Sequence, residues 1–210
     1  MTGCEENRIM KLLDACISES QTGEYHMDIW KSENWKVFYS DKKVRTGLHT
    51  RFDTQIPPEI KWPCYMFCEW VRDYYEFPIR VTIYFKASDT VRAMSGEQIS
   101  GKCSKPYNRL EEPHITIATG AVGDFQKQSQ KHGLEDTIFA ILCTIAHELT
   151  HYYQWLNNTR QGDTEIEHRK NEREARKLGE KKVYQYLIDL GMSQLTETYY
   201  EWKEQDGTKF

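Results

Sequence analysis

The sequence predicts an α+β fold, mostly helical, with a small central antiparallel sheet beside a buried helix. The helix is expected over residues 134–157, because its apolar residues lie nearly all round its surface. The strands cluster in the middle of the chain, where residues 79–86 alternate strictly between apolar and polar side chains. A chain of 210 residues with 39% hydrophobic and 29% charged residues suits one buried core.

In the first third of the chain, apolar residues at helical spacing predict an amphipathic helix over about residues 5–19. Residues 35–52 are mixed in character, and the apolar residues Trp35, Val37 and Tyr39 at every second position favour a strand in this region. Pro63 suits the first turn of a helix that ends before Pro78, since the missing N–H of proline costs nothing there.

Beyond Pro78, residues 79–86 give the best strand, with one buried and one solvated face. A weak strand is expected near residues 97–103 and a second short strand over 114–119. A charged helix is expected over about residues 165–190. We therefore expect a single domain over residues 1–210, with these parts: a helical and mixed subregion 1–75, a catalytic core 76–190 and a C-terminal tail helix 191–210.

Composition and charge exclude several classes of protein. The net charge of -4 argues against a nucleic-acid partner, because phosphate binding depends on clustered Lys and Arg. No apolar run is long enough to span a membrane, and no basic leader with an apolar stretch marks a secretory signal. The six cysteines are scattered, which favours reduced thiols and a cytoplasmic protein. Cys64 and Cys68 stand four apart without a second pair, so we interpret them as half-buried thiols and not metal ligands.

The predicted buried helix carries the motif His147-Glu148-Leu-Thr-His151. Residues four apart lie on the same helix face, so the two imidazoles can bind one cation. Glu148 projects beside that cation, where a carboxylate can hold a water molecule and take its proton. Three ionisable groups on an apolar helix cost several kcal/mol unless they are paired or bind a metal. The motif therefore predicts a metal site.

A catalytic zinc site takes a third protein ligand besides the two histidines. Gln154 and Asn157 stand where the metzincin pattern needs Gly and His, which excludes that class. The remaining candidates lie further along the chain: His168, Glu165, Glu167, Glu172 and Glu174. Of these, Glu174 also suits a surface ion pair with Lys170 or Lys177.

A family resemblance bears on this choice. The segment 144–153 resembles the extended zincin signature, and Asn171-Glu172-Arg-Glu-Ala175 resembles the second gluzincin motif, a Glu followed three residues later by Ala. The resemblance covers roughly residues 79–190 and is nearest to small cytosolic zincins such as the ImmA/IrrE or SprT-like groups. It implies a zincin-like fold and zinc ligation by His147, His151 and Glu172, whereas a SprT-like arrangement would use His168 as the third ligand.

The same resemblance implies two further features. The small Ala175 would let two helices approach each other. The strand before the motif helix would be the edge strand that pairs with an extended substrate through main-chain hydrogen bonds, with these residues: His114, Ile115, Thr116, Ile117 and Ala118. The chain also departs from the family, because Arg176 stands where gluzincins often carry an Asp or Asn that orients a histidine.

The predicted function is that of a zinc metallopeptidase, a hydrolase of peptide bonds with Glu148 as general base and a peptide or protein as substrate. The donor that steadies the oxyanion stays unassigned among five candidates: Tyr152, Tyr153, Tyr199, Tyr200 and His114. Two alternatives remain, a catalytically silent zincin-fold binding or regulatory protein and a structural zinc site closed to water. The intact Glu148 argues against the silent protein, because a metal site kept for structure alone does not need a base. The sequence does not specify an oligomeric state.

Overall fold

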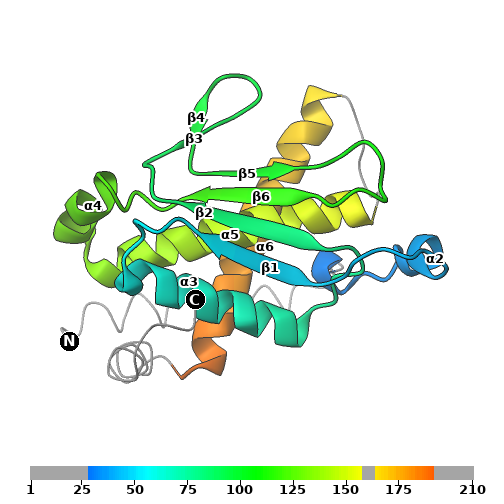
Figure 1. Cartoon of the computed structure of the whole chain (residues 1–210), viewed down its shortest axis with the longest axis horizontal. Coiled ribbons are helices and arrows are strands. Elements are labelled where there is room, and N and C mark those ends of the chain that lie inside the picture. Colours follow the sequence, from blue (N-terminus) through cyan, green and yellow to red (C-terminus); the bar gives the residue numbers. More distant parts are fainter. Residues whose placement is uncertain (1–27, 158–163, 192–210) are drawn as a thin grey trace.

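A four-stranded sheet with helices packed on one face forms the framework of the protein (Figure 1). The structure, a computed structural model, describes residues 28–157 and 164–191. The strands of the main sheet are β1 (Leu48–Phe52), β2 (Val81–Lys86), β5 (Gly101–Ser104) and β6 (His114–Ala118), and a separate hairpin contains β3 (Val91–Arg92) and β4 (Gln98–Ile99). The helices are η1 (Ile29–Lys31), α2 (Lys36–Tyr39), α3 (Pro58–Tyr74), α4 (Asp124–His132), α5 (Leu134–Leu156) and α6 (Glu165–Asp189).

The strand order in the main sheet is β1-β2-β6-β5. β1, β2 and β6 are mutually parallel, and only β5 runs antiparallel, along β6. The expectation of an antiparallel sheet is therefore wrong. The reason lies in α3, which connects β1 to β2 as a crossover helix, and a strand–helix–strand unit places its two strands parallel.

The two faces of the sheet differ in character. Ile83, Phe85, Ile115 and Ile117 are fully buried and belong to the same core cluster as the buried residues of α3 and α5, the helices that cover one face of the sheet (Figure 1). Residues paired across neighbouring strands lie on the same face, so these four side chains form one continuous apolar layer. His114 is exposed, as expected for the first of the alternate positions of β6 that point to the opposite face.

The predicted buried helix is confirmed as α5, with bounds within a residue of those expected. Two tyrosines near its end tie it to the segment that leads into β2: the Tyr152 hydroxyl donates to the Ile79 carbonyl at 2.9 Å, and the Tyr153 hydroxyl donates to the Glu76 carbonyl at 3.2 Å. α5 thereby keeps a fixed position along the sheet, which fixes the histidines that it carries.

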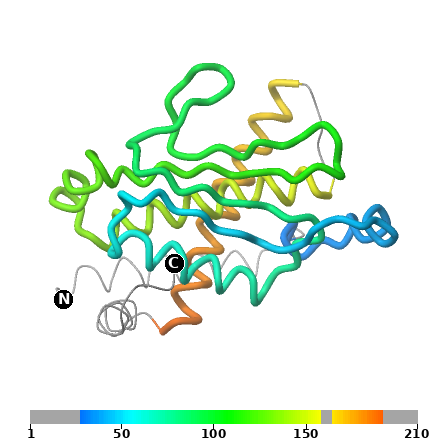
Figure 2. Tube along the Cα trace, in the orientation of Figure 1, coloured from blue at the N-terminus to red at the C-terminus, as the bar shows by residue number. Residues whose placement is uncertain are grey.

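α6 crosses α5 and contacts it through a stripe of residues at helical spacing (Figure 2). The stripe begins with Glu172 and continues through the buried positions Ala175, Gly179, Lys182, Val183 and Tyr186. Gly179 marks a close approach of the two helices, because a Cβ atom there would lie 2.9 Å from the backbone nitrogen of His147. The absence of a side chain at Gly179 lets the two helices meet at the motif histidine.

The structure also tests the remaining helices and strands that the sequence predicts. The strands expected at 79–86 and 114–119 and the helix at 165–190 are present with slightly different bounds, whereas the single weak strand expected near 97–103 is divided into β4 and β5, which belong to different sheets. Within the region 35–52, the strand is β1 at Leu48–Phe52, and the alternating residues do not form one: Trp35, the N-cap of the short helix α2, and Tyr39 are buried one helical turn apart, while Val37 is 87% exposed. α3 begins at Pro58, so Pro63 lies inside it, and α4 was not expected.

The helices expected at 5–19 and 191–210 fall outside the described residues. Among the helices that the structure does describe, none combines the length and the apolar character needed to cross a membrane.

Candidate metal centre

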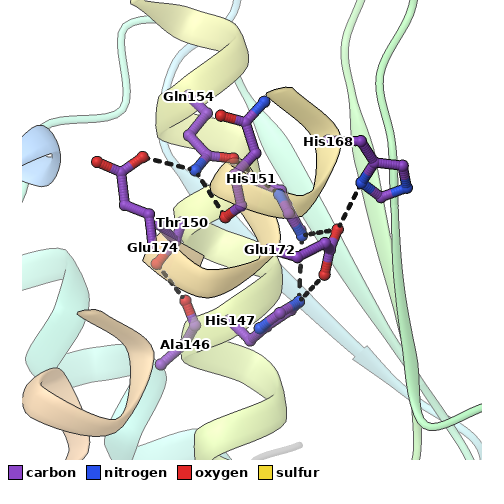
Figure 3. Close-up of polar contacts among 9 residues, drawn as sticks. Ala146, His147, Thr150, His151, Gln154, His168, Glu172 and Glu174 are labelled. Atoms are coloured by element: carbon purple, nitrogen blue, oxygen red, sulfur yellow. Dashed lines mark hydrogen bonds and ion pairs between the residues drawn. The ribbon is translucent and has the colours of Figure 1, made fainter. Parts of the chain in front are cut away.

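His147, Glu172 and His151 meet where α5 and α6 cross (Figure 3). The Nε2 atoms of His147 and His151 lie 3.1 Å apart. The Glu172 carboxylate lies over both rings, with Oε2 at 3.3 Å from the His147 Nε2 and Oε1 at 3.1 Å from the His151 Nε2. The three residues that the sequence analysis proposes as metal ligands thus come together from two helices.

The distances and the donor set fit a small divalent cation. Ligand atoms placed 2.0–2.1 Å from a tetrahedral centre are separated by about 3.3–3.4 Å, close to the separations within the cluster. One ligand atom from each residue can be chosen so that all lie within 4.8 Å of one another. Two imidazole nitrogens and a carboxylate form the His₂Glu set of catalytic zinc sites. The residues could therefore hold Zn²⁺.

The three side chains differ in their exposure to solvent. The side chain of His151 is 10% exposed and that of His147 is 24% exposed, while 42% of the Glu172 side chain is exposed. The imidazoles of His147 and His151 beside the carboxylate hold the pKa of Glu172 well below its usual range, so this carboxyl is ionised. The cluster is anchored in the protein through α5 and reaches solvent on the side of α6.

The other candidates for a third ligand are placed differently. His168 lies one turn before Glu172 with its Nδ1 3.6 Å from the Glu172 Oε1, but its side chain is 71% exposed and it is not part of the convergent cluster. Glu165 pairs with Arg169, and Glu167 accepts from the N-cap residue Thr164. The geometry favours Glu172.

Glu148 lies beneath β5 and is only 6% exposed. A Cβ atom on Gly101 would lie 2.9 Å from the Glu148 Oε1 and 2.7 Å from the Thr144 Cγ2, so only glycine lets the strand approach the helix this closely. Burial raises the pKa of Glu148, while the imidazoles of His151 and His147 and the backbone N–H of Cys103 counteract the shift. A carboxyl with a raised pKa is a stronger base, which suits proton transfer near neutral pH.

The strand expected at the edge of the sheet is not at the edge. β6, with residues His114, Ile115, Thr116, Ile117 and Ala118, lies between β2 and β5 and pairs with both. The edge beside the cluster belongs to β5, which follows β4 and folds back antiparallel onto β6. Since Ile115 and Ile117 point toward the helices, the His114 side chain is on the opposite face and does not reach the cluster.

Of the residues considered for the oxyanion, Tyr152 and Tyr153 are excluded by their positions, because both are fully buried and donate to carbonyl groups in the core. Tyr199 and Tyr200 lie outside the described residues. Cys64 and Cys68 are free and fully buried, deeper than expected, and they are not part of the metal-type cluster found in the described ranges 28–157 and 164–191.

Sequence reasoning missed Gln154 as a member of the site. Arg176, which stands at the position where a histidine-orienting acid was expected, is exposed. The acceptor next to the His151 Nδ1 is instead the Gln154 Oε1 at 2.8 Å, and Glu174, taken for a surface residue, contacts Gln154. The signal was available in the sequence, because residues three apart on a helix are neighbours.

Comparison of the chain with models of protein families, with curated proteins and with solved structures found no match.

Proposed function

We propose that this protein is a zinc-dependent peptidase with His147, His151 and Glu172 as metal ligands and Glu148 as general base. The observation that carries the proposal is the convergence of two imidazole nitrogens and a carboxylate, with a second, buried carboxylate directly beside them. Because Glu148 is the residue next to His147 and has a raised pKa, the site has a base in addition to its ligands.

Zinc supplies Lewis acidity when bound, which lowers the pKa of water toward about 7 and polarises a carbonyl group. Glu148 takes a proton from the attacking water and passes it to the nitrogen of the leaving amine. Its burial under β5 keeps bulk water away from the carboxylate, so proton transfer is directed to the substrate. His151 and His147 are fixed by α5, and Glu172 closes the ligand set from α6.

β5 is the proposed binding edge for the substrate. One side of this strand pairs with β6, and the other is the outer edge of the main sheet among the strands that the structure describes. The backbone N–H of Cys103 interacts with Glu148, which places main-chain donors of β5 next to the proposed base. An extended peptide that pairs with this strand would therefore bring a backbone carbonyl close to Glu148.

The four cysteines within the described part of the chain are all free. Free thiols at these positions support the proposal that the protein works in a reducing compartment such as the cytoplasm.

The test combines metal content with proteolysis. The purified full chain, dialysed with Zn²⁺, is expected to retain about one zinc per chain and to cleave a reduced, unfolded protein. Glu148→Gln should retain zinc and lose cleavage by at least about 100-fold, because the amide cannot take a proton. Glu135→Gln is the matched control, since Glu135 is an exposed carboxylate on the same helix. His151→Ala and Glu172→Ala should lose both zinc and cleavage.

Three outcomes would contradict the proposal. A chain that binds no metal would remove its basis. Zinc retention with equal cleavage by wild type and Glu148→Gln would remove the assigned base. Zinc retention without cleavage of any unfolded protein would instead favour a silent binding or regulatory protein on the same scaffold.

A further inference from the structure

Gln154 lies next to the metal-type cluster, three residues after His151 on α5 and only 4% exposed. Its Oε1 is 2.8 Å from the Nδ1 of His151, on the side of the ring opposite to the Nε2 that faces Glu172. An amide side chain can present either an oxygen or an NH₂ group, so the orientation of this amide decides what the imidazole meets.

The orientation is fixed by two acceptors on α6. The Gln154 Nε2 donates to the backbone carbonyl of Asn171 at 3.1 Å and to the Glu174 Oε2 at 2.9 Å. Neither a carbonyl oxygen nor a carboxylate can donate, so the NH₂ group must face them. The amide oxygen must then face His151, and the hydrogen bond requires that the Nδ1 of His151 carries the proton.

This arrangement determines the tautomer of His151. With its proton on Nδ1, the neutral imidazole has its lone pair on Nε2, the atom directed at the cluster. The hydrogen-bonded series Glu174–Gln154–His151 is therefore a relay. In it, a carboxylate outside the cluster fixes the tautomer of His151, and thus the lone pair on its Nε2, through an intervening amide. Asn171, Glu172 and Glu174 all belong to one turn of α6, so the relay and the carboxylate ligand are positioned together.

We propose that Glu174 is a positioning residue of the metal centre, acting through Gln154 to hold His151 in its metal-binding tautomer and orientation. This inference rests on the proposed metal centre. Partners that orient a ligating histidine typically change metal affinity by about 10- to 100-fold when they are removed. The carboxylate of Glu174 also polarises the amide, which strengthens the acceptor that His151 meets.

The relay explains why a neutral amide occupies position 154. A carboxylate at this buried position would be a better acceptor for His151, but it would also face two further acceptors, the Asn171 carbonyl and Glu174. If position 154 only has to supply an acceptor, Gln154→Glu would tighten zinc binding. In the relay, Gln154→Glu weakens zinc binding, because like charges meet and both hydrogen bonds to α6 are lost.

The experiment measures Zn²⁺ affinity of the full chain by competition with a chromogenic chelator, and the absorption spectrum of the Co²⁺-loaded protein reports the ligand environment. Glu174→Ala and Gln154→Glu are each expected to weaken Zn²⁺ binding by about 10-fold or more. The exchanged pair Gln154→Glu with Glu174→Gln restores a donor opposite a carboxylate and should recover most of the loss. Glu180→Ala, which removes an exposed carboxylate from the same helix, should bind Zn²⁺ as wild type does.

The outcomes separate this inference from the proposed function. If wild type binds no metal, both fail. If wild type binds Zn²⁺ but Glu174→Ala matches Glu180→Ala in affinity and in Co²⁺ spectrum, the relay is wrong and the metal centre stands. Tighter binding by Gln154→Glu, or no recovery in the exchanged pair, also overturns the relay. Should Glu174→Ala fail to fold, Glu174→Gln provides the size-matched variant, with a weaker expected loss of about 3- to 10-fold because only the charge is removed.

Discussion

The two halves of the α6 stripe each carry a charged side chain, Glu172 in the first half and Lys182 in the second, and the surroundings of these two side chains differ. Lys182 is 6% exposed, pairs with Asp28, donates to the Tyr75 hydroxyl at 2.9 Å and lies 4.7 Å from the centre of the Tyr75 ring. Glu172, nearly three turns earlier, faces the nitrogens of two imidazoles and is partly open to solvent.

The difference teaches how to distinguish a structural charge from a functional one. At Lys182 the protein supplies both the cation and its acceptors, so the network is complete within the chain. At Glu172 the converging groups are a carboxylate and two imidazoles, all of which offer lone pairs to one point. A cluster of this second kind is the one that suits an external cation.

The largest expected effect on the free energy of unfolding comes from replacing Lys182. Lys182→Met removes the cation that pairs with Asp28 and should lower the free energy of unfolding by about 2 to 3 kcal/mol, measured by urea denaturation. Adding Asp28→Asn should recover much of the loss, because no unpaired charge then remains. Lys181→Met, at an exposed neighbouring position, is the control. An unchanged stability in Lys182→Met would show that the contacts of Lys182 with Asp28 and Tyr75 do not stabilise the fold.

Gly179→Ala tests whether the close helix crossing serves the cluster. Alanine favours a helix by about 1 kcal/mol over glycine, but its Cβ would lie 2.9 Å from the His147 nitrogen. We expect a net loss of about 2 kcal/mol in unfolding free energy together with weaker zinc binding, measured by chelator competition. Glu180→Ala, on the exposed side of α6, should change neither the unfolding free energy nor the zinc affinity. A stabilised Gly179→Ala variant with normal zinc affinity would contradict the crossing geometry.

Gly101→Ala tests whether β5 serves the cleavage reaction without supporting the metal ligands. The new Cβ would contact Thr144 and Glu148, which moves β5 away from the base. Cleavage of an unfolded protein should fall by about 10- to 100-fold while zinc content stays constant. Thr144→Ser in the same chain removes one of the contacting atoms and should recover part of the activity, and Ser100→Ala is the control. Loss of zinc from Gly101→Ala would mean that β5 supports the ligands themselves.

The smallest effect at neutral pH concerns the Cys68 thiol near the Lys182 end of the stripe, because this thiol changes the stability only in alkaline solution. Burial raises the pKa of the Cys68 thiol to about 12 from an ordinary value of 9.0. Above pH 9 the unfolded chain loses this proton while the folded chain keeps it, so stability is full below pH 9 and falls as pH rises toward 12. The slope from one such group is about 1.4 kcal/mol per pH unit.

Cys68→Ala should therefore show a shallower decline of unfolding free energy between pH 9 and 11 than wild type, measured by urea titration at each pH. Equal slopes in the two proteins would mean that the Cys68 thiol ionises as easily in the folded state as in the unfolded chain.

The sequence by itself determined the elements whose signal is local. The all-round apolar pattern predicted α5, the i and i+4 spacing predicted that His147 and His151 share a face, and the alternation of apolar residues predicted β2. The family resemblance singled out Glu172, and the structure brings that carboxylate within 3.3 Å of both imidazoles.

Only the tertiary structure decided the features that depend on distant pairing. Strand order placed β5, and not β6, at the edge beside Glu148, and the crossover through α3 made the sheet mostly parallel. The roles of Gly101, Gly179 and the Gln154–Glu174 pair follow from contacts between elements far apart in the chain. Local periodicity reports which face of an element is buried, but which element covers that face depends on packing that no short segment encodes.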